Sequence, residues 1–228
     1  MRRRNFIFDI FSIGLISSMT PKINAKEFIN NNMIRSISTW KTTEANLKAG
    51  LMLDKGIDGL SAAVSGVAIE EENPNNTTVG FGGAPDRSGR VTLDACVMNH
   101  LGDCGSVVAV ENIVNVARLA KDVMEKTPHV MLAGKGAEEF AISQGYEKRD
   151  LLTEKSKEDW KKWLENEDYN PVINIENHDT IGMLCLDKNN NISGACTTSG
   201  LAYKMKGRVG DSPIIGSGLF IDNKIGGA

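Results

Sequence analysis

Residues 180–198 read Thr-Ile-Gly-Met-Leu-Cys-Leu-Asp-Lys-Asn-Asn-Asn-Ile-Ser-Gly-Ala-Cys-Thr-Thr, and this stretch decides the fold. Two mainly apolar runs, 181–186 and 192–198, flank a polar turn at 187–191. This pattern predicts a β-hairpin. Thr180 then stands at the very start of a central strand, where the backbone holds its hydroxyl rigidly.

The residues before Thr180 indicate what that hydroxyl could do. A highly charged connector, 148–169, leads to Asn177, His178 and Asp179. If the chain is cut directly before Thr180, the freed α-amino group has a pKa of about 7.7–8.0 and can take the hydroxyl proton near neutral pH. One residue then supplies both nucleophile and base. By itself, however, an Asp-Thr pair is more commonly a helix cap.

A second motif, Gly207-Arg208-Val209-Gly210-Asp211-Ser212-Pro213, follows the hairpin. Arg208 could bind the α-carboxylate of an amino acid as a bidentate fork, and Asp211 could bind its ammonium group. The alternative is a surface salt bridge, which contributes only about 0–1 kcal/mol. Taken alone, this motif favours the salt bridge.

Periodicity upstream predicts alternating helices and strands. We expect residues 80–86 to form a glycine-rich turn between two strands. In the charged connector, Trp160 and Trp163 would share one face of a helix, and we expect the connector to pack through that face. The expected helices are 43–56, 60–71, 107–126 and 137–144, with a loop through 70–76, and the expected strands are 91–98 and 130–133.

Composition excludes several classes of protein. The 228 residues are 41% hydrophobic and 24% charged, as in folded globular proteins, and the net charge of −3 gives no reason to expect a nucleic-acid partner. No apolar run is long enough to span a membrane. Only three histidines occur, which argues against a histidine-rich metal site. The four cysteines lack a zinc or redox spacing, so we interpret them as small buried hydrophobes.

The N-terminal residues have the layout of a secretory signal. Arg2, Arg3 and Arg4 precede a mostly apolar stretch, 6–19, and Ala25 closes a passable cleavage site. We therefore expect residues 1–25 to be a signal peptide, and the protein to be periplasmic or secreted, or lysosomal in a eukaryotic source. A frayed amphipathic extension is the alternative.

From Ser38 to Ala228 the chain resembles the glycosylasparaginases, also called aspartylglucosaminidases, of the N-terminal-nucleophile hydrolases, and most closely their bacterial members. The motifs that carry this resemblance are Ser38-Thr39-Trp40, Gly80-Phe81-Gly82-Gly83-Ala84-Pro85-Asp86, Val91-Thr92-Leu93-Asp94-Ala95, His178-Asp179-Thr180-Ile181-Gly182-Met183, Thr197-Thr198-Ser199-Gly200 and the Gly207–Pro213 motif. The resemblance implies an α/β fold of the four-layer αββα sandwich type. It also implies that a family segment carrying a Thr-Gly oxyanion hole follows Ala228, so that the sandwich is incomplete at its C-terminus.

The resemblance further implies a mechanism and a role for each site residue. The precursor would cleave itself between Asp179 and Thr180, helped by His178, into an α region (26–179) and a β region (180–228). Thr180 would then attack the side-chain amide of glycosylated asparagine, with Thr198 beside it. Arg208 and Asp211 would bind the substrate, and Trp40 would line its pocket.

No cofactor or metal is implied, and the partners implied are a small-molecule substrate and a second αβ unit in a dimer. Two alternatives remain open: an asparaginase or isoaspartyl peptidase of the same superfamily, and an inactive truncated remnant.

Overall fold

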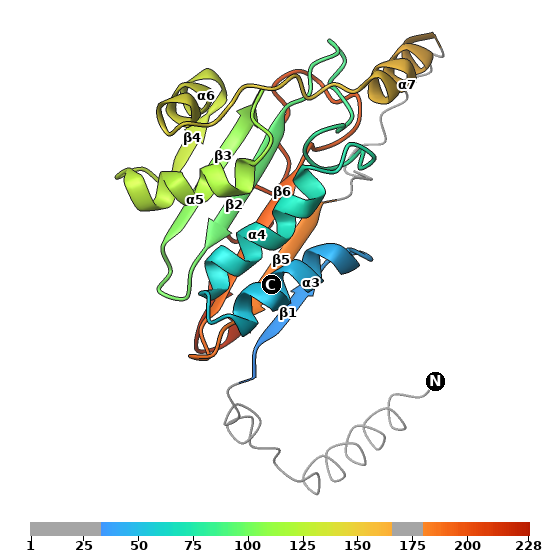
Figure 1. Cartoon of the computed structure of the whole chain (residues 1–228). Coiled ribbons are helices and arrows are strands. Elements are labelled where there is room, and N and C mark those ends of the chain that lie inside the picture. Colours follow the sequence, from blue (N-terminus) through green and yellow to red (C-terminus); the bar gives the residue numbers. More distant parts are fainter. Residues whose placement is uncertain (1–32, 166–179) are drawn as a thin grey trace, which may run out of the picture. The chain divides into compact units, whose positions relative to one another are not determined.

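The computed structural model describes residues 33–165 and 180–228. Its centre is a six-stranded sheet with the order β1-β5-β6-β2-β3-β4 (Figure 1). The strands are β1 (Arg35–Ser38), β2 (Leu93–Met98), β3 (Cys104–Val110), β4 (Met131–Ala133), β5 (Ile181–Leu186) and β6 (Ile192–Thr198). The helices are α3 (Thr43–Asp54), α4 (Gly59–Glu71), α5 (Val116–Lys126), α6 (Gly134–Ser143) and α7 (Glu154–Glu165). The predicted α/β class is confirmed.

The predicted hairpin is confirmed as β5 and β6. These strands pair antiparallel, with Ile181 opposite Thr197 and Leu186 opposite Ile192. The turn is held by Asp187, whose Oδ1 accepts hydrogen bonds from the backbone N–H groups of Asn189 (2.8 Å) and Asn191 (3.0 Å). The hairpin forms the middle of the sheet, because β1 lies on one side of it and β2 on the other.

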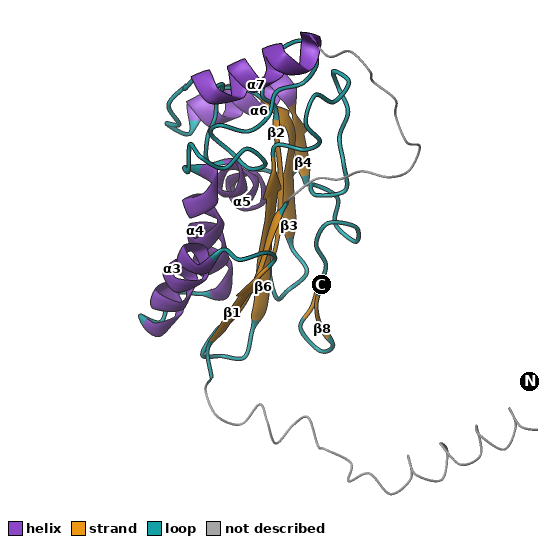
Figure 2. Ribbon diagram, turned by 90° about the vertical axis from the view of Figure 1, so that its right-hand side faces the viewer, coloured by secondary structure: helices purple, strands orange, loops and turns teal. Residues whose placement is uncertain are grey.

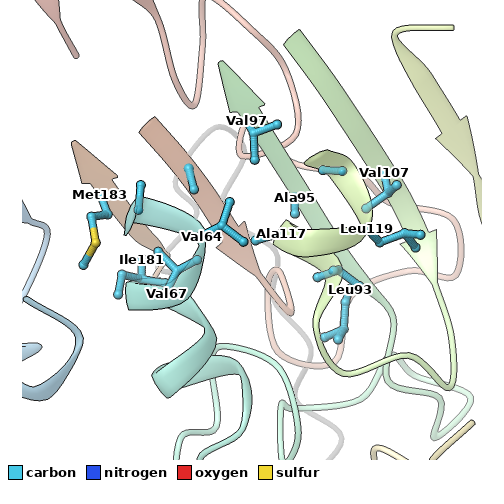
Figure 3. Close-up of a cluster of buried hydrophobic side chains, with 14 of the residues drawn as sticks. Val64, Val67, Leu93, Ala95, Val97, Val107, Ala117, Leu119, Ile181 and Met183 are labelled. Atoms are coloured by element: carbon cyan, nitrogen blue, oxygen red, sulfur yellow. The ribbon is translucent and has the colours of Figure 1, made fainter. Parts of the chain in front are cut away.

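A layer of helices covers one face of the sheet, with α3, α4 and α5 side by side in Figure 2. Val64 and Val67 of α4 and Leu119 of α5 lie in the same buried cluster as Ala95 and Ile181 of the sheet (Figure 3). The fit is close at Gly66 of α4: a β-carbon there would lie 2.5 Å from the Met183 sulfur. Burial of these apolar side chains is the main source of stability for this layer.

The other face of the sheet carries a small two-stranded sheet, β7 (Ile221–Asp222) and β8 (Gly226–Gly227), seen opposite the helices in Figure 2. Leu219 and Ile221 pack there against Cys96, Met98 and Cys196. All four cysteines are free; Cys104 is half-buried, and the other three are buried as predicted. The described residues thus supply one helical layer, one large sheet and a small hairpin.

Two sequence predictions were wrong. The expected helix 107–126 is strand β3 followed by α5, because the valine-rich segment 107–110 pairs with both β2 and β4. Asn112, with φ of 64°, lies in the turn between β3 and α5. The glycine-rich segment 80–86 does not lie between two strands; it follows helix α4 and leads to β2.

The other expected elements are present. Strands 91–98 and 130–133 appear as β2 and β4, slightly shorter than predicted, and the short helix appears as α6 with Gly145 at a φ of 85° just beyond its end. Helix α7 packs through its aromatic side, where the Trp163 ring stacks on Tyr203 with centroids 4.7 Å apart. None of the described helices combines the length and apolarity needed to cross a membrane. The expected signal peptide, 1–25, lies outside the described residues.

Candidate active site

Thr180 lies directly before β5, between the ends of two neighbouring strands. Strand β1 pairs with β5 through Ser38 and Met183, so the chain after β1 passes beside Thr180. Strand β6 pairs through Thr197 and Ile181, which brings its last residue, Thr198, to the other side. The sheet topology therefore gathers three segments that are distant in the sequence around one half-buried threonine.

The segment after β1 anchors the Thr180 backbone. The Thr180 carbonyl oxygen accepts hydrogen bonds from Thr39 Oγ1 (2.8 Å) and from Trp40 Nε1 (3.1 Å). Thr39 Oγ1 also accepts a hydrogen bond from the Gly182 N–H at 3.0 Å. One hydroxyl therefore fixes the backbone before and after Ile181. Trp40 adopts a φ of 60° and leaves its side of the site open, with 65% of its surface exposed.

The Thr180 hydroxyl faces a second hydroxyl. Its Oγ1 lies 3.0 Å from Oγ of Ser212, which is almost completely buried. The loop around Ser212 is fixed to the sheet, because Cys96 Sγ donates to the Ser212 carbonyl (3.1 Å) and Ser106 Oγ to the Pro213 carbonyl (2.8 Å). Ser212 belongs to the Gly207–Pro213 motif, but nothing in the sequence indicated a role for it.

Thr198 is buried at the end of β6. Its hydroxyl donates to the Thr78 carbonyl at 3.3 Å and accepts a hydrogen bond from the Gly200 N–H at 2.9 Å. Where β6 pairs with β2, Thr198 lies opposite Asp94. The Thr198 hydroxyl is therefore held in one orientation beside the start of β5.

Arg208 and Asp211 lie in the loop after β6, with Arg208 half-buried and Asp211 exposed. Two glycines make room for the Arg208 guanidinium: a β-carbon on Gly210 would lie 2.8 Å from one of its nitrogens, and one on Gly200 would lie 3.2 Å away. Larger residues at these positions would displace the guanidinium. The loop containing the predicted substrate ligands is thus shaped around this side chain.

Two buried charged residues, Lys204 and Asp94, were missed in the sequence. Lys204 Nζ donates to the carbonyls of Ser199 (2.7 Å) and Thr92 (3.3 Å), and Asp94 Oδ1 accepts from the Ala109 N–H at 2.7 Å. Burial lowers the pKa of Lys204 and raises that of Asp94. Each charge opposes the burial effect on the other, and the Arg208 charge also favours ionised Asp94.

His178 and Asp179 lie outside the described residues, so the predicted cleavage point is described only from its Thr180 side. Within residues 33–165 and 180–228, no three His, Cys, Asp or Glu side chains come together to hold a metal ion. A groove of about 590 Å³ lies between the start of α5 and the end of α6, and Thr180 is not among its lining residues.

A hydroxyl residue at the head of a central strand, in a sheet covered by helices, is the arrangement of the N-terminal-nucleophile hydrolases. Within that class the family is clear: the family model described as Asparaginase matches residues 23–228, and the chain belongs to this family. A protein of Elizabethkingia miricola named N(4)-(beta-N-acetylglucosaminyl)-L-asparaginase is 54% identical, over 94% of this chain and 62% of its own length. A Rattus norvegicus protein of the same name is 33% identical, over 84% of this chain and 65% of its own length. The chain thus spans about three fifths of the length of these curated relatives.

Proposed function

We propose that this chain carries the nucleophile of an N4-(β-N-acetylglucosaminyl)-L-asparaginase, which hydrolyses the amide bond between N-acetylglucosamine and asparagine. The observation that carries the proposal is the placement of Thr180 at the head of β5, with its hydroxyl 3.0 Å from Ser212 Oγ and its carbonyl anchored by Thr39 and Trp40. The names of the two relatives support the choice of substrate.

The first step is activation by self-cleavage. Thr180 Oγ1 attacks the carbonyl carbon of Asp179, the peptide C–N bond breaks, and the nitrogen takes the hydroxyl proton. Water then hydrolyses the resulting ester, leaving a carboxylate on Asp179 and a free α-amino group on Thr180. In this proposal His178 and Asp179 assist the cleavage, and the processed regions are 26–179 and 180–228.

The second step is hydrolysis of the substrate. The Thr180 α-amino group takes the Oγ1 proton while Oγ1 attacks the side-chain amide carbon of the asparagine. The C–N bond breaks, the glycosylamine leaves with that proton, and water releases aspartate from the ester. Thr198 would stay beside the nucleophile and tune both its hydroxyl and its amine, a role that its fixed hydroxyl supports.

Recognition of the substrate would use the amino-acid end of the molecule. Arg208 would bind the α-carboxylate, Asp211 the α-ammonium group, and Trp40 would line the pocket. The space left for the guanidinium by Gly200 and Gly210 supports a defined position for Arg208. The half-buried position of Arg208 also favours a ligand contact over a fully solvated surface salt bridge, because solvent screens exposed charges more strongly.

The proposal extends to the cell and the assembly. A periplasmic or secreted location rests on the signal-like pattern of residues 1–25, and a dimer of processed αβ units rests on the family resemblance. Fractionation of the source cells tests the first. Size-exclusion chromatography with light scattering on the processed protein tests the second, and a mass of one αβ unit would contradict it.

The experiment that tests the activity uses the whole 228-residue chain. Incubation with N4-(N-acetylglucosaminyl)-asparagine should release aspartate, and N-terminal sequencing should find a fragment that begins Thr-Ile-Gly-Met. Thr180→Ala should abolish both. Thr127→Ala is the matched control, because the Thr127 hydroxyl contacts only backbone groups around the end of α5.

The alternatives predict different results. Faster turnover of isoaspartyl dipeptides than of glycosylasparagine would support the asparaginase or isoaspartyl peptidase reading. A protein that neither cleaves itself nor turns over any of these substrates would support the inactive remnant.

A further inference from the structure

Glu71, the last residue of α4, has a fully buried carboxylate that the proposed mechanism does not use. Its Oε1 accepts hydrogen bonds from the Ala117 N–H at the start of α5 (2.9 Å) and from Thr197 Oγ1 of β6 (2.8 Å). Its Oε2 is buried and has no hydrogen-bond partner among the described residues. One carboxylate thus joins two helices to the central hairpin.

A carboxylate is an unfavourable group at such a position. Burial raises the pKa of Glu71 to about 7, although the hydrogen bonds from Ala117 and Thr197 favour the ionised form. An apolar side chain of similar size would avoid the loss of hydration. An apolar residue could accept neither the hydrogen bond from the Ala117 N–H nor the one from the Thr197 hydroxyl. The hydrogen bond from Thr197 is the one that connects Glu71 to the candidate site.

Thr197 occupies a key position in the candidate site. It is the Cα partner of Ile181, the residue directly after Thr180, and it directly precedes Thr198. Neighbouring side chains of a strand point to opposite faces. Glu71 therefore holds Thr197 from the helical face and thereby sets the backbone that presents Thr198 and the start of β5.

The main chain of Glu71 makes a second connection to the same strand end. Its carbonyl accepts a hydrogen bond from the Phe81 N–H (2.7 Å), which fixes the loop 77–84. The Thr78 carbonyl in that loop accepts hydrogen bonds from Ser199 N–H (2.8 Å) and Thr198 Oγ1 (3.3 Å). Side chain and main chain of Glu71 thus act on the end of β6 from two directions.

We propose that Glu71 is a positioning residue for the Thr180 site, acting through its hydrogen bond to Thr197 to hold Thr198 and the start of β5 in register. The kinetic reading of this inference rests on the proposed function. Its structural reading does not, because the positions of Thr180 and Thr198 can be measured without a substrate.

The test compares five variants of the whole chain, one of which is the Glu71→Leu/Thr197→Val double variant. Glu71→Leu removes the acceptor, Thr197→Val removes the donor, and Glu71→Gln keeps an oxygen that can accept both hydrogen bonds. The control is Asp187→Ala, which removes a different buried carboxylate, in the β5–β6 turn at the opposite end of β5 from Thr180. All rates are expressed per mole of processed Thr180 N-terminus, so that a loss of folded protein does not count as a loss of kcat.

Glu71→Leu and Thr197→Val should each lower kcat by about 10- to 100-fold, because small displacements of reacting groups have effects of this size. KM should change less than about twofold, since Arg208 and Asp211 are untouched, and the double variant should be no slower than the slower single variant. Glu71→Gln should retain most of kcat. Asp187→Ala should leave kcat unchanged even if it lowers the melting temperature.

Threonine methyl NMR spectra provide the readout that needs no substrate. Glu71→Leu should shift the signals of Thr198 and Thr180, whereas Asp187→Ala should leave both in place. Unchanged Thr180 and Thr198 signals in both Glu71→Leu and Thr197→Val would overturn the inference. If the wild-type protein does not hydrolyse glycosylasparagine but Glu71→Leu still shifts the Thr180 and Thr198 signals, the proposed function is overturned and the positioning role is supported.

Discussion

Thr180 Oγ1 and Ser212 Oγ lie 3.0 Å apart, although 32 residues separate them in the sequence. Ser212 is held from behind by the Cys96 thiol, which donates to its carbonyl, and it is almost completely buried. A fixed hydroxyl at this distance can orient the Thr180 hydroxyl before it reacts. Ser212 is therefore the contact through which the loop after β6 meets the proposed nucleophile.

Ser212→Ala should lower kcat by about 2- to 10-fold with little change in KM, since a single neutral hydrogen bond contributes about 0.5–1.5 kcal/mol. Separate measurements of the rates of self-cleavage and of substrate hydrolysis on the whole 228-residue chain check this prediction. Ser217→Ala, an exposed serine of the same loop, is the control and should behave like wild type. Equal rates for the two variants would show that Ser212 does not orient Thr180.

Gly210→Ala should raise KM by about tenfold while kcat changes little. A β-carbon at this position would lie 2.8 Å from an Arg208 guanidinium nitrogen, so the guanidinium must move, and a displaced charge-assisted hydrogen bond is worth about 1.5–3 kcal/mol. Steady-state kinetics on glycosylasparagine measure both constants. The control is Gly136→Ala in α6, where a β-carbon meets no atom within 4 Å. A fall in kcat at constant KM would argue against substrate binding by Arg208.

Much of the fold could be predicted because local signals agreed with the tertiary structure. The hairpin 181–198 combines two apolar strands with an unambiguous polar turn, and it forms as predicted. The prediction of a helix at 107–126 was wrong because Val107, Val110 and Val114 also fit a helical period. What decides its structure is pairing of 104–110 with β2 and β4, which no local pattern reveals.

The candidate site was predictable in part for the same reason. Thr180 directly precedes β5 and Thr198 ends β6, so the hairpin register, which pairs Ile181 with Thr197, places the two threonines side by side. Glu71 gave no such signal: it lies where the expected helix 60–71 meets the expected loop 70–76, and only the packing of α4 against α5 and β6 buries it. Lys204 and Asp94 were missed because burial of a charged side chain depends on distant neighbours.

Gly80→Ala should destabilise the fold more than Gly102→Ala, although both glycines have positive φ, 64° and 93°. The strain of the left-handed conformation, about 1–2 kcal/mol, is common to both. At Gly80 the new β-carbon would also lie 2.1 Å from the Glu71 carbonyl oxygen, whereas at Gly102 it meets nothing within 4 Å. The difference in unfolding free energy, measured with urea, should be about 1–3 kcal/mol. Equal losses would mean that the loop 77–84 moves away from Glu71 without cost.

Glu71→Gln should change how stability depends on pH. The pKa of Glu71 is about 7 in the folded protein and 4.5 as the ordinary value, so between these pH values the folded protein holds a proton that the unfolded chain has released. This extra proton stabilises the folded protein. The stabilisation is fully present below pH 4.5 and is lost as the pH rises to about 7, which lowers the free energy of unfolding by up to roughly 3 kcal/mol. Glutamine does not titrate, so wild type should lose stability relative to the variant over this range. Glu72, whose charge raises the pKa of Glu71, and Tyr146, whose own pKa the Glu71 charge raises, are the same in both proteins. Urea unfolding at pH 4.5, 6 and 8 measures the difference, and a constant difference would show that Glu71 stays ionised when buried.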